Sequence, residues 1–195
     1  KCMIKVYGSW ISSRVDKAVQ LIPAEEAQIT FIREKLKISE DAVQDIDIET
    51  IAAARAGHTW ARTARTTKMM NRWLPVGHNW RHHGADNDKC PGCGAPDETF
   101  GHLFHCPNAK LRAVCTEAVE HIGRAGTSLK IPASIMWLLL KILKHECKLE
   151  TVNPPPEGCL KKIWEAQSQI GFHNFITGWI SRSWQRGLKY YDSDD

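Results

Sequence analysis

The stretch that decides the fold reads Cys90-Pro-Gly-Cys-Gly94 and, after a gap, His102-Leu-Phe-His-Cys-Pro107. Two cysteines separated by Pro and Gly favour a tight turn in which both sulfurs face one point. His102 and Cys106 are four positions apart, so a helix would place both side chains on one face. The spacing therefore predicts two pairs of ligands that close around one metal ion.

The predicted ligands are three thiolates, from Cys90, Cys93 and Cys106, and one imidazole, from His102. This donor set is typical of tetrahedral zinc, with bonds of about 2.3 Å to sulfur and about 2.0 Å to nitrogen. Because the protein fills all four positions, we expect one structural Zn²⁺ ion without an open site for water. His105 is the alternative nitrogen ligand, but adjacent side chains diverge by about 100° on a helix, which favours His102.

The residues before His102 are expected to support the metal site. Asp97 has the residue type of a helix N-cap and is expected to start the short helix that carries His102. Glu98 lies one turn before His102, and two roles are open for its carboxylate. It accepts a hydrogen bond from the second ring nitrogen of His102, or it lies in solvent at the start of the helix.

The same residues resemble the zinc-binding domain found at the C-terminal end of retrotransposon reverse transcriptases. The similarity lies in Cys-Pro-x-Cys-Gly, in the Glu98-Thr99 pair, and in His-Leu-Phe-x-Cys-Pro at residues 102–107. The runs Lys68–Gly77 and Ile170–Phe175 are similar to segments that flank that domain. The resemblance implies a non-catalytic region that follows the polymerase in a retroelement polyprotein and contacts template RNA or target DNA.

The chain carries no constellation typical of an enzyme. We find neither a paired-aspartate polymerase motif nor a ribonuclease carboxylate cluster. A zinc deaminase would need a glutamate two residues after a metal-binding histidine, and that position after His102 is Phe104. We therefore expect this chain not to be an enzyme itself, although it has the features of the tail of a reverse transcriptase.

Composition limits the class of protein. The 195 residues are 43% hydrophobic and 25% charged, which is typical of a folded globular protein. The most apolar run, Ile131–Leu143, is shorter than the roughly 20 residues that a bilayer-spanning helix needs, so we expect no membrane partner. Seven cysteines without a secretory signal favour an intracellular protein, nuclear or cytoplasmic. Because the sequence opens at Lys1, it is expected to be a fragment of a longer chain.

Positive charge is concentrated in one segment. Residues 51–89 hold seven basic and two acidic side chains, whereas the net charge of the whole chain is only +4. Several of these basic residues recur at helical spacing, so a helix would align them along phosphates. The alternative is that the arginines are merely solvated while Met69, Trp73 and Leu74 face the core. The candidate nucleic-acid-binding residues are Arg55, Arg62, Arg65, Lys68, Arg72 and Arg81.

Periodicity and capping residues predict a mainly α-helical fold with one small zinc-held turn plus helix and a short N-terminal strand within 2–7. Helices are expected at 24–36, from Asp45 or Asp47 to Gly57, at 58–74, from 111 to a stop at Gly123, at 132–149 and, with breaks at one or more glycines, over 158–188. Residues 75–89 read as a loop.

Three regions follow from this pattern. Residues 1–57 form an N-terminal helical region, 58–150 a zinc-binding helical domain, and 151–195 a C-terminal amphipathic segment with an acidic tail. Asn153 and the three prolines after it form a stiff connector before the last region. The aromatic stripe of that region is expected to be core, although a docking surface is the alternative. The leading hypothesis is thus a nucleic-acid-binding zinc module, and the alternative is a zinc-stabilised protein-interaction or scaffold module.

Overall fold

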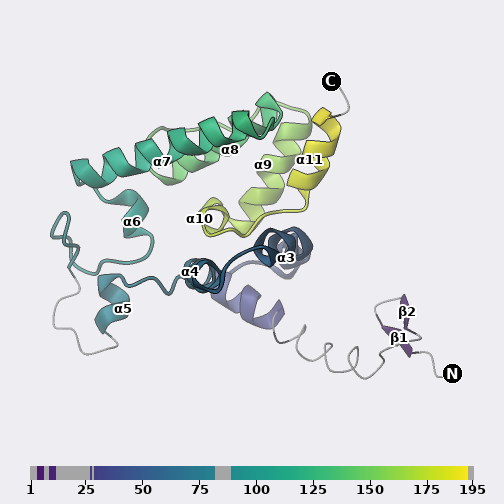
Figure 1. The fold of residues 1–195 in the computed structure, drawn as a ribbon, viewed down its shortest axis with the longest axis horizontal. Coiled ribbons are helices and arrows are strands. Elements are labelled where there is room, and N and C mark those ends of the chain that lie inside the picture. Colours follow the sequence, from purple (N-terminus) through teal and green to yellow (C-terminus); the bar gives the residue numbers. More distant parts are fainter. Residues whose placement is uncertain (1–3, 7–8, 12–26, 28, 82–88, 193–195) are drawn as a thin grey trace.

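The computed structural model describes residues 4–6, 9–11, 27, 29–81 and 89–192, and this part of the chain is mainly helical (Figure 1). At the N-terminus, strand β1 (Ile4–Val6) pairs antiparallel with β2 (Ser9–Ile11), with Lys5 opposite Trp10. The predicted mainly helical class is confirmed, and the single predicted strand is one half of a short hairpin.

A helix over 29–36 comes next in the described chain. The helices that follow are α2 (Glu40–Gln44), α3 (Ile48–Ala56), α4 (Trp60–Met70), α5 (Gly77–Arg81), α6 (His102–His105), α7 (Ala109–Ser128), α8 (Ala133–Glu146), α9 (Cys159–Ile170), α10 (Phe172–Ile176) and α11 (Ser183–Asp192). No helix among the described residues is both long and apolar enough to span a membrane.

One hydrophobic core joins residues 32–70 to the last region of the chain. Leu36, Ile46 and Ile51 from the first helices are buried together with Ile170 and Trp179 from the last region. The indole Nε1 of Trp179 also donates a 3.1 Å hydrogen bond to the carbonyl of Met70, so its polar edge is satisfied inside this core. Side chains from all three regions expected from the sequence therefore share one cluster.

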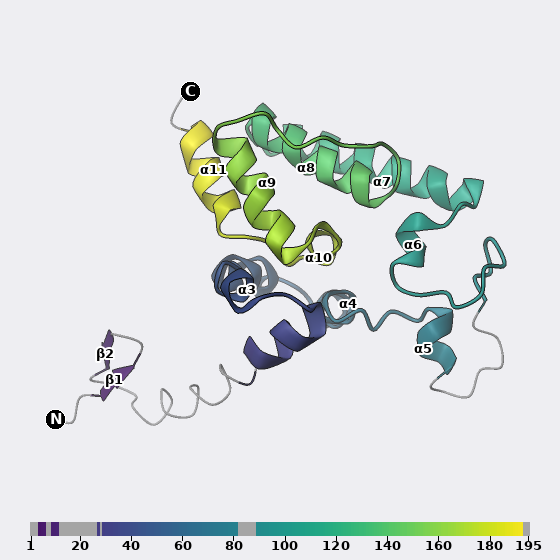
Figure 2. The same ribbon diagram turned by 180° about the vertical axis from the view of Figure 1, so that it is seen from behind.

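A second core lies between α8, α9 and α11, which lie side by side in Figures 1 and 2. Leu138 and Ile142 of α8 are fully buried against Ile163 of α9 and Trp184 of α11. Phe175 stacks on Trp184 with ring centroids 5.0 Å apart. Most of the C-terminal aromatic stripe is thus core, and the docking alternative does not apply to these buried residues.

A buried network of hydrogen bonds connects the last region of the chain to the first. The side-chain oxygen of Gln167 accepts hydrogen bonds from the backbone of Ser181 at 3.1 Å and from the indole of Trp184 at 3.0 Å. Ser181 in turn donates to the carboxylate of Asp45 at 2.5 Å, and its backbone bridges to Ile46. Because each of these buried polar groups has a hydrogen-bond partner, the network fixes the positions of Asp45, Gln167 and Ser181 relative to one another.

Several predicted helix ends lie at the residues that the sequence indicated. Asp47 caps α3 by accepting from the backbone of Thr50 at 3.0 Å. The last region breaks at Gly171 and Gly178, whose φ angles of 97° and 100° are open to glycine but strained for other residues. Gly187, by contrast, lies inside α11 without a break.

Other expectations are wrong. The helix expected to stop at Gly123 continues through Ser128, and the glycine that lies tightly against α8 is Gly126, where a Cβ would overlap Met136. The helix expected to reach Leu74 ends at Met70, and Arg72 takes a left-handed φ of 57°. The predicted loop after Pro75 begins with the short helix α5, and α2, capped by Ser39, was not expected.

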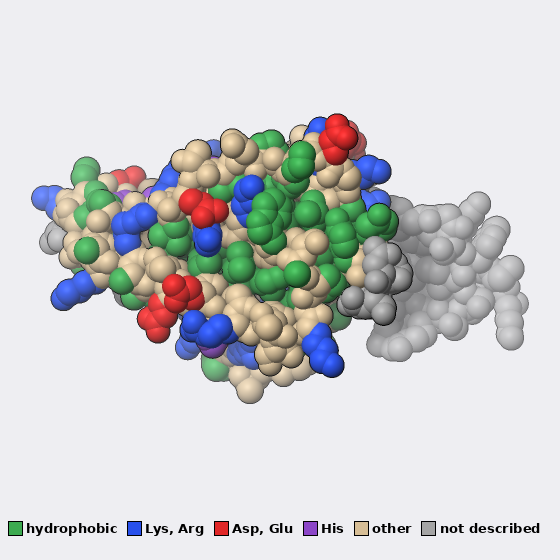
Figure 3. Space-filling view, turned by 90° about the horizontal axis from the view of Figure 1, so that it is seen from above, with side chains coloured by type: hydrophobic (Ala, Val, Ile, Leu, Met, Phe, Trp, Pro, Cys, Tyr) green, Lys and Arg blue, Asp and Glu red, His purple; other side chains and the backbone are tan. Residues whose placement is uncertain are grey.

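The amphipathic helix α7 is only partly covered. Its apolar side chains Val114 and Ile122 are exposed, as is Trp137 on the adjoining helix α8. Figure 3 shows hydrophobic side chains gathered on this face of the α7–α8 pair. The expected amphipathic helix is confirmed, although part of the apolar surface of the α7–α8 pair is exposed.

Candidate metal centre

The first half of the site is a tight turn that carries Cys90 and Cys93. The backbone N–H of Gly94 donates to the carbonyl of Cys90 at 2.8 Å, and the N–H of Cys90 donates to Ala95 at 2.9 Å. Gly94 has a φ of 73°, which a residue with a Cβ rarely adopts. The N–H of Gly92 points at the Cys90 sulfur, 3.4 Å away, as backbone donors do around thiolate ligands.

The second half of the site is the short helix α6 and the residue after it. His102 opens α6, and its backbone N–H donates to the carbonyl of Thr99 at 3.1 Å. Cys106 follows the helix with ψ of 128°, because the proline at 107 disfavours helix at the residue before it. The expected cap is wrong: Asp97 has a left-handed φ of 58° and lies before the turn that leads into α6.

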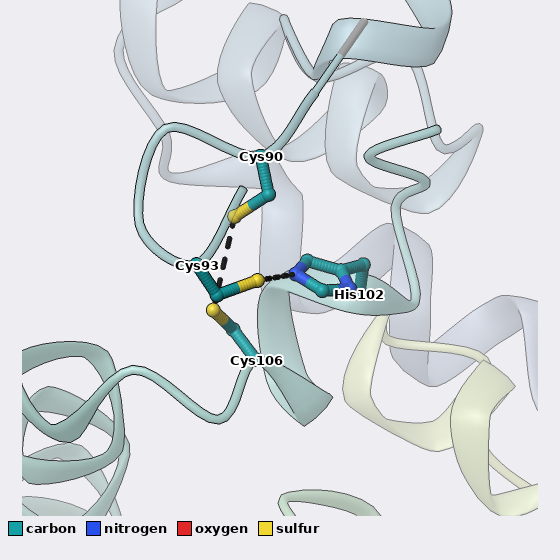
Figure 4. Close-up of side chains that lie close together, drawn as sticks. All are labelled: Cys90, Cys93, His102 and Cys106. Atoms are coloured by element: carbon teal, nitrogen blue, oxygen red, sulfur yellow. Dashed lines mark hydrogen bonds between the residues drawn. The ribbon is translucent and has the colours of Figure 1, made fainter. Parts of the chain in front are cut away.

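The structure brings the four predicted ligands together (Figure 4). Their ligand atoms all lie within 4.8 Å of one another. The sulfurs of Cys90 and Cys106 are 3.7 Å apart, and the sulfur of Cys93 is 3.3 Å from Nε2 of His102. Ligands on a tetrahedral zinc ion would be about 3.8 Å apart for two sulfurs and about 3.5 Å apart for sulfur and nitrogen. The cluster could therefore hold a metal ion with little movement.

The surroundings of the cysteines favour the thiolate form of Cys93 and disfavour that of Cys106. A hydrogen bond with the backbone of Ala95 lowers the pKa of Cys93, whereas desolvation raises the pKa of Cys106. Cys90 and Cys106 are both buried, and all three cysteines are free thiols. Burying several thiolates costs free energy unless a cation compensates their charge, which a divalent metal does directly.

Asn108 links the first half of the site to helix α7. Its side-chain N–H donates to the carbonyl of Gly92 at 2.6 Å. Its side-chain oxygen accepts from the backbone N–H groups of Lys110 and Leu111, which caps α7. The sequence reasoning missed this residue, although an asparagine directly before an amphipathic helix is a recognisable N-cap signal.

Glu98 links the site to helix α5. The side chain is only 8% exposed, and its carboxylate accepts a 2.9 Å hydrogen bond from the backbone N–H of Gly77. Its backbone carbonyl accepts from His78 at 3.0 Å, and the ring of His78 also contacts Asp97 at 2.9 Å. The expectation of a solvated Glu98 is therefore wrong, and the partner of its carboxylate is a backbone group of α5, not the expected ring nitrogen of His102.

His105, the alternative nitrogen ligand, is not part of the cluster. It is exposed at the end of α6 and lines a separate cavity with Phe104. One residue of helix rotates a side chain by about 100°, which turns His105 away from the sulfurs. The geometry therefore favours His102 as the nitrogen donor.

The six predicted basic residues differ in their surroundings. Arg62, Arg65 and Lys68 are exposed on α4. Arg55 is half-buried and donates to Thr67 at 2.5 Å. Of the remaining two candidates, Arg72 donates to Asn174 at 2.6 Å after the end of α4, and for Arg81 the structure describes only the backbone, at the end of α5.

Two tryptophans of the basic segment, Trp60 and Trp73, lie on the surface. Trp60 is 85% exposed and Trp73 is 55% exposed. The residue of α4 that enters the core is Met70, so the expectation of an inward Trp73 is wrong. The structure therefore places the basic residues of α4 and two tryptophans on the surface of one segment.

Comparison of the chain with protein-family models, with curated protein sequences and with solved structures finds no match.

Proposed function

We propose that Cys90, Cys93, His102 and Cys106 hold one structural Zn²⁺ ion. The observation that supports this proposal is the closeness of three sulfurs and one imidazole nitrogen, all within 4.8 Å. Soft sulfur donors and a borderline nitrogen select zinc over harder cations, which prefer oxygen. The protein fills all four positions, so the ion would have no site left for a reacting water.

The zinc would fasten the cysteine turn to helix α6. The turn that carries Cys90 packs on α7 through Asn108, and Glu98 joins the same module to α5. Helix α6 has only four residues and no side-chain cap, so it is too short to be stable alone. A metal bound by both halves supplies the stability that this local sequence lacks.

We further propose that helix α4 contacts the phosphates of RNA or DNA. Helix α4 contains no acidic residue, and Arg62, Arg65 and Lys68 form no ion pair with any described residue. Three such contacts would make the affinity for duplex DNA fall by about 40-fold between 50 and 200 mM salt. The exposed ring of Trp60 would add stacking on unpaired bases, about 1 to 3 kcal/mol for each base.

In this proposal the chain is a non-catalytic part of a retrotransposon-type reverse transcriptase polyprotein. The support is the resemblance of the Cys90–Pro107 motif to the zinc-binding domain of those proteins, together with the metal-ligand geometry. The partners would be nucleic acid and an upstream polymerase region of the same polyprotein.

A gel-shift series tests the nucleic-acid contact. The full chain is titrated into RNA, single-stranded DNA and duplex DNA at 50 and 200 mM salt. The R62E/R65E variant is expected to lose at least about tenfold in affinity, because two attractive contacts become repulsive. The matched control is R124E/K130E, which makes the same change of net charge near the end of α7 and just after it. Equal losses in both variants, or no shift with any probe, would contradict the proposal.

The second candidate function is a protein-interaction or scaffold module. The observation that favours it is the exposed apolar face of α7 and α8, with Val114, Ile122 and Trp137 (Figure 3). Contiguous apolar surface of this kind often marks a contact with another protein. Sedimentation at two salt concentrations separates the two functions: association that persists in high salt, without any nucleic-acid shift, would favour the scaffold.

A further inference from the structure

A cavity of about 600 Å³ lies next to the metal-binding module but does not contain its ligands. It is bordered by the end of the 29–36 helix, by α5 and α6, and by the last turn of α8 and the start of α10. Figures 1 and 2 place α10 near the end of α4, with α6 between α5 and α7. The volume lies in the range of pockets that hold small organic ligands.

The charged lining of this cavity is mostly positive. Among the described residues that line the cavity, Lys35, Lys37 and Arg72 carry positive charge, and Glu146 has the one carboxylate. Within the described part of the chain, none of these three cations forms an ion pair. Desolvation raises the pKa of Glu146, so its negative charge is itself disfavoured. The cavity therefore attracts an anion.

A hydrogen bond holds the guanidinium of Arg72 in a fixed position at this cavity. Its guanidinium donates to the side-chain oxygen of Asn174 at 2.6 Å, and Asn174 is fully buried. The amide nitrogen of Asn174 donates in turn to the carbonyl of Ile170 at 2.5 Å, which fixes the orientation of the acceptor. Desolvation lowers the pKa of Arg72, because its charge is partly buried without a counterion. A bound anion would compensate this charge, and a planar guanidinium suits phosphate oxygens.

The remaining wall combines polar side chains, from Asn79, Thr99 and three histidines, with an aromatic and apolar part. Phe100 and Phe104 meet edge to face, with ring centroids 5.4 Å apart, and Ile176 lies on the same cavity. Aromatic side chains of this kind stack on flat rings regardless of base identity. The cavity thus offers a cationic part for a phosphate and an aromatic part for a planar ring.

We propose that this cavity binds a nucleotide, with its phosphate at Lys35, Lys37 and Arg72 and its base against Phe100 and Phe104. The inference goes beyond the proposed function, because it depends on neither the identity of the metal nor the surface of α4. The nucleotide can be free or can be one unit of a nucleic-acid strand, since both present the same phosphate and ring.

Isothermal titration of the full chain tests this site with three probes: adenosine 5′-monophosphate, adenosine and inorganic phosphate. The monophosphate is expected to bind at least about tenfold more tightly than either of the other two, because only it uses both parts of the cavity. Adenosine binding as tightly as the monophosphate would overturn the phosphate site. Phosphate binding as tightly as the monophosphate would overturn the base site.

Variants of the cavity residues test whether the monophosphate binds in this cavity. K35Q/K37Q removes two surface charges without touching the core and is expected to weaken monophosphate binding by about tenfold or more. R72Q is expected to do the same, and its circular dichroism reports whether the fold persists. K189Q, on the exposed face of α11, is the control and should leave the affinity unchanged. Unchanged binding by K35Q/K37Q would overturn the proposal.

Competition separates the two sources of the nucleotide. A single-stranded DNA of ten nucleotides is added to the R62E/R65E variant, which lacks the proposed phosphate contacts of α4. Displacement of the monophosphate assigns the cavity to a strand, and failure to displace it assigns the cavity to a free nucleotide. Monophosphate binding that is lost in R62E/R65E alone would overturn the cavity and leave α4 as the site.

Discussion

The carboxylate of Glu98 accepts a 2.9 Å hydrogen bond from the backbone N–H of Gly77, 21 residues earlier in the chain. Both residues are buried, and the N–H belongs to the first turn of α5, where no helical carbonyl is available. This hydrogen bond, together with the contacts of His78, therefore helps to fix the position of the candidate metal site relative to the segment that follows α4.

Loss of this carboxylate should destabilise the fold. E98A leaves the buried N–H of Gly77 without a partner, which typically costs about 1 to 3 kcal/mol. Urea denaturation of the metal-loaded protein measures the change in the free energy of unfolding. E117A, on the exposed side of α7, is the control and should stay within about 0.5 kcal/mol of the unmodified chain. Equal stability of E98A and E117A would contradict the role given to Glu98.

Asn108 should matter both for stability and for the metal. N108A removes the cap of α7 and the hydrogen bond to Gly92, so a loss of about 1 to 2 kcal/mol is expected. Because Gly92 belongs to the cysteine turn, the same variant should release metal to a chelator faster. N153A changes an exposed asparagine in the proline-rich connector and should do neither. Identical release rates for both variants would argue against the link.

Alanine substitutions at two helical glycines should have different effects on the stability of the fold. A Cβ at Gly187 would lie 2.3 Å from Cδ1 of the buried Ile163, so G187A is expected to cost about 1 to 3 kcal/mol by overpacking. A Cβ at Gly123 would lie 3.4 Å from Leu140, so G123A should be neutral or stabilise α7 by up to about 1 kcal/mol. Thermal unfolding compares them, and a G187A variant as stable as G123A would disprove this packing.

Cys147 should resist alkylation in the folded protein. Desolvation, aided by the neighbouring Cys115, raises the pKa of Cys147 to about 12. A raised thiol pKa favours the protonated form, so at pH 8 the thiolate fraction is about one in ten thousand, and only the thiolate reacts. Mass spectrometry after brief iodoacetamide treatment should find Cys147 unmodified until the pH approaches 12 or the chain is denatured. Rapid labelling of Cys147 at pH 8 in the folded state would contradict this.

The candidate metal ligands could be identified from the sequence because local spacing alone brings them together. The cysteine turn and the short helix each place two donors by chain geometry within a few residues, as at Cys90 and Cys93. Helix starts at Asp47 and breaks at Gly171 and Gly178 are likewise local effects of a side-chain cap or of positive φ. These features needed no knowledge of the rest of the fold.

The rest depends on contacts between residues far apart in the chain. Neither the Arg72–Asn174 hydrogen bond nor the burial of Glu98 has a signal in the adjacent sequence. The stop expected at Gly123 was wrong for the same reason, since α7 continues through Ser128 against α8, with Met136 packed over Gly126. The division of the basic residues could not be foreseen either, because Arg55 finds its partner Thr67 only when α3 meets α4.

The metal content of the purified chain tests the central claim most directly. Elemental analysis of the full chain, prepared without added chelator, should find about one zinc per chain. The C106S variant should hold much less, while C115S, which changes a cysteine outside the cluster, should match the unmodified protein. A folded chain that contains no stoichiometric zinc, or a C106S variant that retains it fully, would contradict the account.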